Sequence, residues 1–180
     1  MCGIVGIVRC NKTREQDAYY VAQMLQVQHH RGPDATGTCP ISTGVLGHNR
    51  LSILDLSAGA DQPFHYQEIS IVFNGEVYNY LELREELLDL GYTFQTTGDT
   101  EVICAAYLAW GQDCVKRFVG MWAFALWDVR KEELFCSRDR FGIKPFNYIF
   151  NEGDFIFASE LKTLKIVPEF NPEINQKQVA

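Results

Sequence analysis

Short apolar runs bounded by polar or glycine-containing stretches recur along most of the chain. Runs of this length predict β-strands, and runs that follow one another closely predict hairpins. The last two flank the polar stretch 151–154, which predicts a turn between them. The runs of strand length are residues 2–9, 44–48, 69–73, 121–127, 134–137, 146–150 and 155–158.

The stretches between these runs predict turns and loops at particular places. The run 69–73 ends at Asn74-Gly75, a pair that forms turns easily. Residues 51–54 form a further short apolar piece, and residues 57–65 predict a loop. The cluster Arg31-Gly-Pro-Asp34 contains strong helix breakers and is expected to follow the end of a helix.

Three segments carry apolar residues at helical spacing. The first covers residues 14–28, the second begins at Tyr80 and stops at Gly91, and the third begins at Asp99 or Thr100 as its cap. The residues on the predicted buried faces are Ala18, Val21, Ala22 and Leu25 in the first, Leu83, Leu87 and Leu90 in the second, and Val102, Ile103, Ala106, Tyr107 and Trp110 in the third.

This order of elements predicts an α+β fold in which mainly antiparallel sheets are covered by helices. The helices fall in the first two thirds, whereas strands occur throughout. With 180 residues, 47% of them hydrophobic, the chain can bury one sizeable core. We therefore expect one domain over residues 1–165, followed by the polar, proline-punctuated stretch 166–180 as the start of a linker.

Charge and composition exclude several classes of partner. The net charge is −7 and no run of Lys or Arg occurs, which argues against nucleic acid and anionic membranes. The sequence has no apolar run of spanning length and no secretory signal, so we expect a cytoplasmic protein. The six cysteines are scattered through an apparently cytosolic chain, which predicts free thiols rather than disulfides. No spacing of cysteines and histidines suits zinc, so no metal site is expected.

The start of the chain, Met1-Cys2-Gly3, offers a nucleophile. If the methionine is trimmed, Cys2 carries both a thiol and a free α-amine. Such an amine has a pKa of roughly 7.7–8.0, so it can accept the thiol proton directly or through one water. The competing interpretation is a small core residue on a first strand, and for an isolated Met-Cys start that interpretation is favoured.

Four polar clusters lie at the predicted ends of strands. Alone, His30–Asp34 predicts a structural turn, while Arg50 is equally suited to clasping a carboxylate or to lying on a strand edge. Asn74 and Gly75 could donate to an oxyanion or simply form a turn. Asp99 could bind a ligand ammonium, although helix capping is the commoner role. Together the clusters describe a glutamine site: a cation, an anion, a thiol and oxyanion donors.

Six motifs, in order along nearly the whole chain, resemble the class II glutamine amidotransferase domain. Within that class they are most similar to the N-terminal domain of glutamine-hydrolysing asparagine synthetases. The motifs are Met1-Cys-Gly-Ile-Val-Gly6, His30-Arg-Gly-Pro-Asp34, Arg50-Leu-Ser-Ile-Leu-Asp55, Asn74-Gly-Glu-Val-Tyr-Asn79, Thr97-Gly-Asp-Thr-Glu101 and Ser137-Arg-Asp-Arg-Phe-Gly-Ile-Lys-Pro145.

The resemblance implies an N-terminal-nucleophile hydrolase fold, an αββα sandwich of two antiparallel sheets. Cys2 would be the nucleophile, and the Asn74 side chain and Gly75 backbone would form the oxyanion hole. Arg50 would hold the α-carboxylate of glutamine, and Asp99 with Glu76 its ammonium group. The pocket would be lined by the segment Leu51, Ser52, Ile53 and Leu54, whereas the motif at 138–145 would be structural and face a partner domain.

The resemblance also implies partners that lie outside these residues. L-Glutamine would be the substrate, and its ammonia would pass to aspartate in a C-terminal synthetase domain. That domain would use ATP and Mg²⁺ through a Ser-Gly-Gly loop absent here, so no cofactor is expected in this domain. A homodimer is left open. The alternatives are an amidotransferase for another carboxylate and a non-catalytic interaction module of the same fold.

Overall fold

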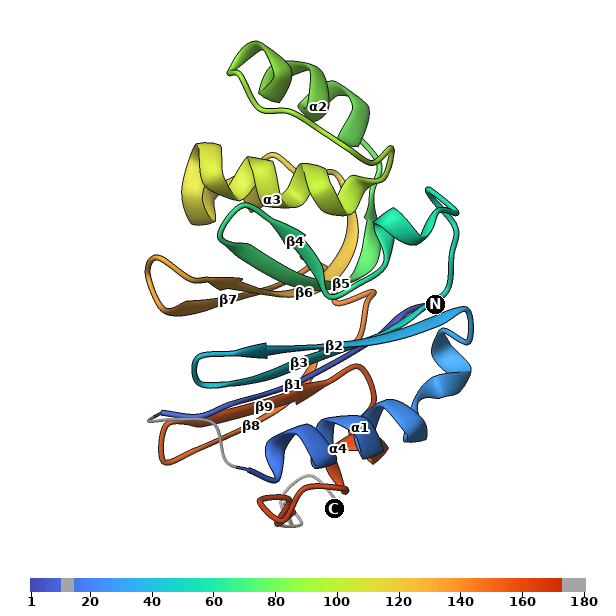
Figure 1. Cartoon of the computed structure of the whole chain (residues 1–180), viewed down its shortest axis with the longest axis vertical. Helices are drawn as coiled ribbons and strands as arrows, with labels where there is room; N and C mark the ends of the chain where they lie inside the picture. Colours follow the sequence, from blue (N-terminus) through green and yellow to red (C-terminus); the bar gives the residue numbers. More distant parts are fainter. Residues whose placement is uncertain (11–14, 173–180) are drawn as a thin grey trace.

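The computed structural model of the chain describes residues 1–10 and 15–172. Two antiparallel sheets lie face to face, as Figure 1 shows. The first has the order β2-β3-β1-β9-β8 and the second the order β4-β5-β6-β7. The strands are β1 (Gly3–Val8), β2 (Ala35–Ile41), β3 (Gly44–Arg50), β4 (Phe64–Tyr66), β5 (Ile69–Val77), β6 (Gly120–Asp128), β7 (Glu133–Arg138), β8 (Asn147–Asn151) and β9 (Asp154–Ala158).

Helices cover the outer face of each sheet and complete four layers (Figure 1). The first sheet carries α1 (Asp17–Val27) and α4 (Leu161–Leu164), and the second carries α2 (Tyr80–Asp89) and α3 (Asp99–Trp110). Three short 3₁₀ helices connect these elements: His29–Arg31, Ala58–Ala60 and Gly111–Lys116. The predicted α+β fold and the αββα sandwich are confirmed.

Alternation along β5 explains how a polar side chain reaches the space between the sheets. Ile71 and Phe73 pack beneath the helices of the second sheet, whereas Val72 packs in the cluster between the two sheets. Because successive side chains point to opposite faces of a strand, Asn74 faces the same way as Val72. The register of β5 thus directs the Asn74 carboxamide towards the first sheet.

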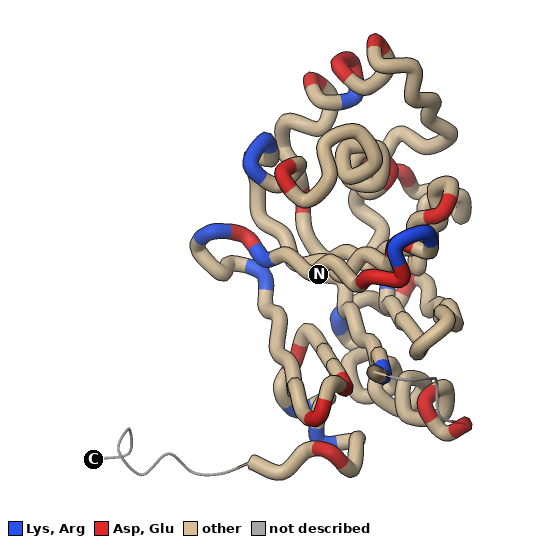
Figure 2. Tube along the Cα trace, turned by 90° about the vertical axis from the view of Figure 1, so that its left-hand side faces the viewer, with Lys and Arg blue, Asp and Glu red and all other residues tan. Residues whose placement is uncertain are grey.

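β1 lies inside the first sheet and pairs on both edges. It pairs with β3, where Gly3 lies opposite Asn49, and with β9, where Val5 lies opposite Ala158. Both its faces are apolar and buried, as its continuous hydrophobic run predicts. Cys2 directly precedes this strand, so a rigid, doubly paired element fixes the position of its thiol. Figure 2 shows the N-terminus midway between the two helical layers.

Most predicted strands are confirmed, and four differences from the predictions concern strands. The run 69–73 does not stop at a turn, because β5 continues through Asn74-Gly75 to Val77 while paired with β6. The predicted loop 57–65 contains the first two residues of β4. The apolar piece 51–54 belongs to no strand, and β2 was not predicted at all.

The three predicted helices are confirmed with shifted ends, but Ala18, Ala22 and Leu90 of the predicted buried faces are exposed. The first begins at Asp17, and Arg14 lies outside the described residues. The second stops before Gly91, whose φ of 89° suits glycine. Asp99 is the first residue of α3 rather than its cap, which is Gly98. The short helix α4 was not predicted.

The segment after α4 still packs on the domain. Val167 is buried and Phe170 is partly buried in the cluster on the helical side of the first sheet. Residues 173–180 of the predicted linker lie outside the described residues, and the boundary at residue 165 stays a prediction. No helix among the described residues is long and apolar enough to cross a membrane.

Candidate active site

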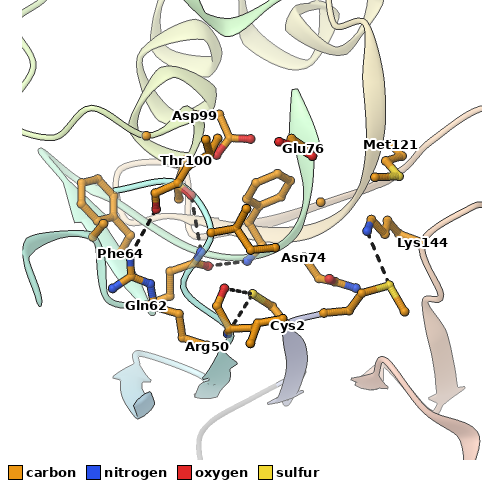
Figure 3. Close-up of a pocket in the computed structure, with 18 of the residues that line it drawn as sticks. Cys2, Arg50, Gln62, Phe64, Asn74, Glu76, Asp99, Thr100, Met121 and Lys144 are labelled. Atoms are coloured by element: carbon orange, nitrogen blue, oxygen red, sulfur yellow. Dashed lines mark hydrogen bonds between the residues drawn. The ribbon is translucent and has the colours of Figure 1, made fainter. Parts of the chain in front are cut away.

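A cavity of about 370 Å³ opens at the N-terminal end of β1. Its wall is built from elements that are distant in sequence: the chain start, the end of β3, the loop after it, the second half of β5, the start of α3 and the loop before β8. Figure 3 shows the labelled side chains that line it, Cys2, Arg50, Asn74, Glu76 and Asp99 among them. These five were predicted as site residues, and the fold brings them together.

The Cys2 thiol lies against the backbone of Leu51. Its sulfur is 3.4 Å from the Leu51 nitrogen, which donates to it, and 3.6 Å from the Leu51 carbonyl oxygen. The Cys2 carbonyl accepts a hydrogen bond from Arg31 Nε at 2.9 Å. Burial raises the pKa of the thiol, while the Leu51 hydrogen bond and nearby positive charges oppose that rise. The thiol therefore needs assistance to ionise.

Asn74 supplies a donor that is free to meet a ligand. Its side chain is 1% exposed, and its Nδ2 has no hydrogen-bond partner among the described residues. A buried amide without a partner is costly, so such a group indicates a position that a ligand oxygen occupies. This is the chemistry expected of an oxyanion donor.

The Gly75 N–H is a second donor aimed away from β6. On the same strand, the N–H groups of Phe73 and Val77 donate to Gln62 Oε1 and Asp99 Oδ2 rather than to β6. Alternate residues of an antiparallel strand direct their N–H groups to the same edge, so Gly75 points there too. A Cβ at Gly75 would come within 2.4 Å of the Met121 oxygen, so only glycine fits.

Asp99 and Glu76 make one part of the cavity negative. Asp99 is 5% exposed and accepts the Val77 N–H at 2.9 Å. Burial raises the pKa of Asp99 to about 6, and the charge of Glu76 adds to the rise, while the Val77 hydrogen bond opposes it. A ligand ammonium placed here would favour both carboxylates in their charged form.

Arg50 lies on the cavity wall and also organises the loop that follows it. Its Nη1 donates to the Ser57 carbonyl at 2.9 Å and to Asp61 Oδ1 at 2.7 Å. Its Nη2 donates to the carbonyls of Leu54 and Asp55. The guanidinium is thus partly engaged within the protein, and its role in holding a substrate carboxylate stays a prediction.

The loop predicted to line the pocket does so in part. Leu51, Ile53 and Leu54 line the cavity. Ser52 is not among the lining residues, and its N–H donates instead to Asp34 Oδ2 at 2.8 Å. The breaker cluster 30–34 therefore supports the site, since Asp34 holds this loop and Arg31 holds Cys2.

Two polar residues, Gln62 and Lys144, are among the cavity residues that the sequence analysis did not single out. Gln62 lies in a segment without any pattern, and its Oε1 accepts the Phe73 N–H at 2.7 Å. Lys144 belongs to the motif 138–145, which was interpreted as structural, yet its side chain lines the cavity. The motif itself was the signal that could have found Lys144.

An αββα sandwich with a cysteine just before its central strand, and an amide nitrogen without a partner among the described residues in the same cavity, has the architecture of an N-terminal-nucleophile amidotransferase. The chain matches the model of the glutamine amidotransferase domain over residues 1–180, and it belongs to that family. It is 43% identical over 196 residues to a putative glutamine-hydrolysing asparagine synthetase 2 of Methanocaldococcus jannaschii, covering 97% of this chain and 37% of that protein. It is 36% identical to the glutamine-hydrolysing asparagine synthetase 3 of Bacillus subtilis, covering 98% and 29%.

Solved structures agree on the fold. A glutamine phosphoribosylpyrophosphate amidotransferase of B. subtilis, complexed with ADP and GMP, superposes with a TM-score of 0.74 at 21% identity, covering 92% of this chain and 43% of that one. The predicted resemblance to class II glutamine amidotransferases is confirmed. The chain spans about a third of the length of the two asparagine synthetases it matches.

Proposed function

We propose that the chain hydrolyses the side-chain amide of L-glutamine through a thioester on Cys2. The observation that carries this proposal is the thiol beside the Leu51 N–H in a cavity that also holds the unpaired Asn74 amide. Once Met1 is removed, the α-amine of Cys2 accepts the thiol proton. The thiolate then attacks the amide carbon, and Asn74 Nδ2 and the Gly75 N–H stabilise the oxyanion.

The rest of the reaction returns the enzyme to its starting state. The α-ammonium gives its proton to the leaving nitrogen, the C–N bond breaks and ammonia departs, leaving a γ-glutamyl thioester. Water attacks the thioester with the same amine as base, the C–S bond breaks, and glutamate and the thiol are released. No metal or organic cofactor is needed for these steps.

The cavity suits glutamine in size and charge. Its volume of about 370 Å³ is at the lower end of the range typical of small-molecule sites, roughly 300–1,000 Å³. The α-ammonium of glutamine would lie by Asp99 and Glu76, and its α-carboxylate by Arg50, with Leu51, Ser52, Ile53 and Leu54 shaping the loop between. This orientation leads the side-chain amide towards Cys2.

The ammonia would be used for amide synthesis in a longer protein. Two relatives are named glutamine-hydrolysing asparagine synthetases, which supports aspartate as the acceptor. We propose that the amide is made in a C-terminal synthetase domain that binds ATP and Mg²⁺. A cytoplasmic location, consistent with free cysteines in the structure, and self-association to a homodimer remain part of the proposal. Amide formation on a carboxylate other than aspartate, by the full-length protein supplied with glutamine and ATP, would identify a different acceptor.

The glutaminase proposal is tested by product release. Processed protein, with Met1 loss verified by intact mass, should release ammonia and glutamate in equal amounts from glutamine. Cys2→Ala should release neither, while Cys10→Ala, which changes an exposed thiol, should match the wild type. Wild-type protein that binds glutamine without releasing ammonia would favour a non-catalytic module and refute the proposal.

A further inference from the structure

Lys144 is a buried cation with no carboxylate partner among the residues that the structure describes. The residue is 6% exposed and lines the cavity. Its Nζ lies 3.6 Å from the Met1 sulfur, and no ion pair to a carboxylate forms within the part of the chain that the structure describes. Burying an ammonium without a counter-charge is costly, so its place beside the chain start calls for a function. Figure 3 shows Lys144 among the side chains that line the cavity.

The loop that carries Lys144 is fixed by its own hydrogen bonds. Asp139 accepts the N–H groups of Ile143 and Lys144, both at 2.9 Å. Arg138 Nε donates to the Lys144 carbonyl at 2.6 Å, and its Nη2 donates to the Gly142 carbonyl. The ammonium is therefore held in the cavity by a pre-organised backbone rather than by a partner for its charge.

Other charged groups also face the chain start, and their charges are better compensated. Arg31 contacts the Cys2 carbonyl but pairs with Glu160 at 3.2 Å. Arg50 pairs with Asp61 at 2.7 Å. The carboxylates of Glu76 and Asp99 line the cavity as well, and they oppose ionisation of the thiol. Among the cationic side chains near Cys2 in the described part of the chain, Lys144 is thus the one without a carboxylate partner.

We propose that Lys144 is a positioning residue that acts on Cys2 through its charge. It favours, at neutral pH, the state in which the thiol and the α-amine of Cys2 together have lost one proton. Its positive charge favours the thiolate and disfavours a protonated amine, so the pair loses its first proton more readily. Removal of Met1 takes away the sulfur that Lys144 contacts. It also frees the α-amine of Cys2, and the charge of Lys144 influences the protonation of this amine. This inference rests on the proposed glutaminase function.

The test measures Cys2 acidity without glutamine. Processed protein is treated with iodoacetamide between pH 5 and 10. The rate of Cys2 alkylation is measured on the N-terminal peptide by mass spectrometry. Lys144→Met should move the midpoint of Cys2 alkylation up by about one pH unit and slow alkylation near neutral pH by up to tenfold. Lys144→Gln should behave alike. Lys144→Arg should restore the wild-type profile, and Lys165→Met, which removes an exposed lysine charge elsewhere, should leave it unchanged.

Glutamine kinetics separate this inference from the proposed function. For Lys144→Met the acidic limb of kcat/KM should shift by the same amount as the alkylation midpoint, with KM unchanged at alkaline pH. An unshifted midpoint in both neutral variants would overturn the inference, as would a raised KM at every pH, which would assign Lys144 to the substrate carboxylate. Absence of ammonia release by the wild type would refute the glutaminase, while the alkylation profiles still decide the role of Lys144.

Discussion

A buried cation lies near each end of β1. At one end its charge is paired with carboxylates, whereas at the other end it is not paired with any carboxylate among the described residues. Arg9, just after the strand, has a side chain that is 2% exposed and binds Asp17, Asp154 and Glu169. Lys144 lies in the cavity at the other end of the strand, and among the described residues its ammonium contacts only the Met1 sulfur. A buried charge that the fold compensates indicates a structural role, whereas one left for a ligand or a reacting group indicates function.

The hydrogen-bonding groups at the two ends of β1 also differ in whether they have partners within the described structure. Around Arg9, the guanidinium ties together β1, the start of α1, β9 and the C-terminal segment. Around Cys2, the Asn74 amide has no partner in the described structure, and Asp99 is buried beside Glu76. The first end should therefore respond to mutation in stability and the second in activity.

The largest expected effect is on stability at the Arg9 end. Arg9→Met should lower the free energy of unfolding by about 3–5 kcal/mol, because it removes the buried guanidinium that binds Asp17, Asp154 and Glu169. Urea unfolding checks this, and the folded fraction should keep the wild-type kcat. A loss below about 1 kcal/mol would show that Arg9 is not a structural centre.

At the opposite end, Asn74→Ala should lower kcat by about 10²–10³-fold, because one oxyanion donor contributes about 3–4 kcal/mol to the transition state. Steady-state ammonia release checks this. Asn147→Ala, which removes a hydrogen bond to the Ser159 carbonyl away from the cavity, is the matched control and should keep kcat. Near-normal turnover of Asn74→Ala would remove that residue from the oxyanion hole.

Asp99 should make glutamine binding depend on pH. Its pKa is raised from 3.8 to about 6, so the carboxylate gains a proton as the pH falls through 6 and loses its attraction for an ammonium. KM for glutamine should rise below pH 6 in the wild type. Asp99→Asn should raise KM by roughly 10–100-fold, since a hydrogen bond to a charged group contributes about 1.5–3 kcal/mol, and should remove this pH dependence.

The same shift has a consequence for stability. An acid whose pKa is higher in the folded than in the unfolded state makes the fold bind more protons, so its contribution to stability falls as the pH rises from about 4 to 6. Asp99→Asn should therefore unfold at higher urea concentration than the wild type at pH 7. A lower midpoint would show that the charged carboxylate stabilises the empty site.

The smallest effect belongs to a pair that lies at neither end. Lys116 and Asp113 are both 72% exposed and form an ion pair at 2.8 Å. Asp113→Ala should change the free energy of unfolding by only about 0.2–1 kcal/mol, because water already solvates both charges. A larger loss of stability in urea unfolding would show that exposed ion pairs also contribute strongly. The number of ion pairs would then predict stability better than the compensation of buried charges.

Sequence patterns predicted the elements whose own residues determine them. The continuous apolar run of β6 and the helical spacing of Leu83 and Leu87 are examples. β2 was missed because Ala35–Ile41 contains threonine, glycine and proline on an edge strand. Asn74-Gly75 favours a turn locally, but nine residue pairs between β5 and β6 override that preference.

The candidate site follows the same division. Motifs located Cys2, Asn74 and Asp99, because the residue types themselves carry the chemistry. Gln62 was not found because nothing in its own segment marks it. Lys144 lies in a motif that was interpreted as structural, and only the fold shows that its side chain lines the cavity. A buried charge can be compensated by a residue more than a hundred positions away in the sequence, as Arg9 is by Asp154. A local sequence pattern therefore cannot predict the compensation.

The most direct test of the account is to trap the acyl-enzyme. Processed protein mixed with glutamine, quenched in acid within milliseconds to seconds and digested, should carry a γ-glutamyl group on the peptide that begins at Cys2. The adduct should form before free glutamate reaches its steady rate. Ammonia release with no adduct at Cys2 at any time, or an adduct on another cysteine, would contradict an N-terminal thiol as the nucleophile.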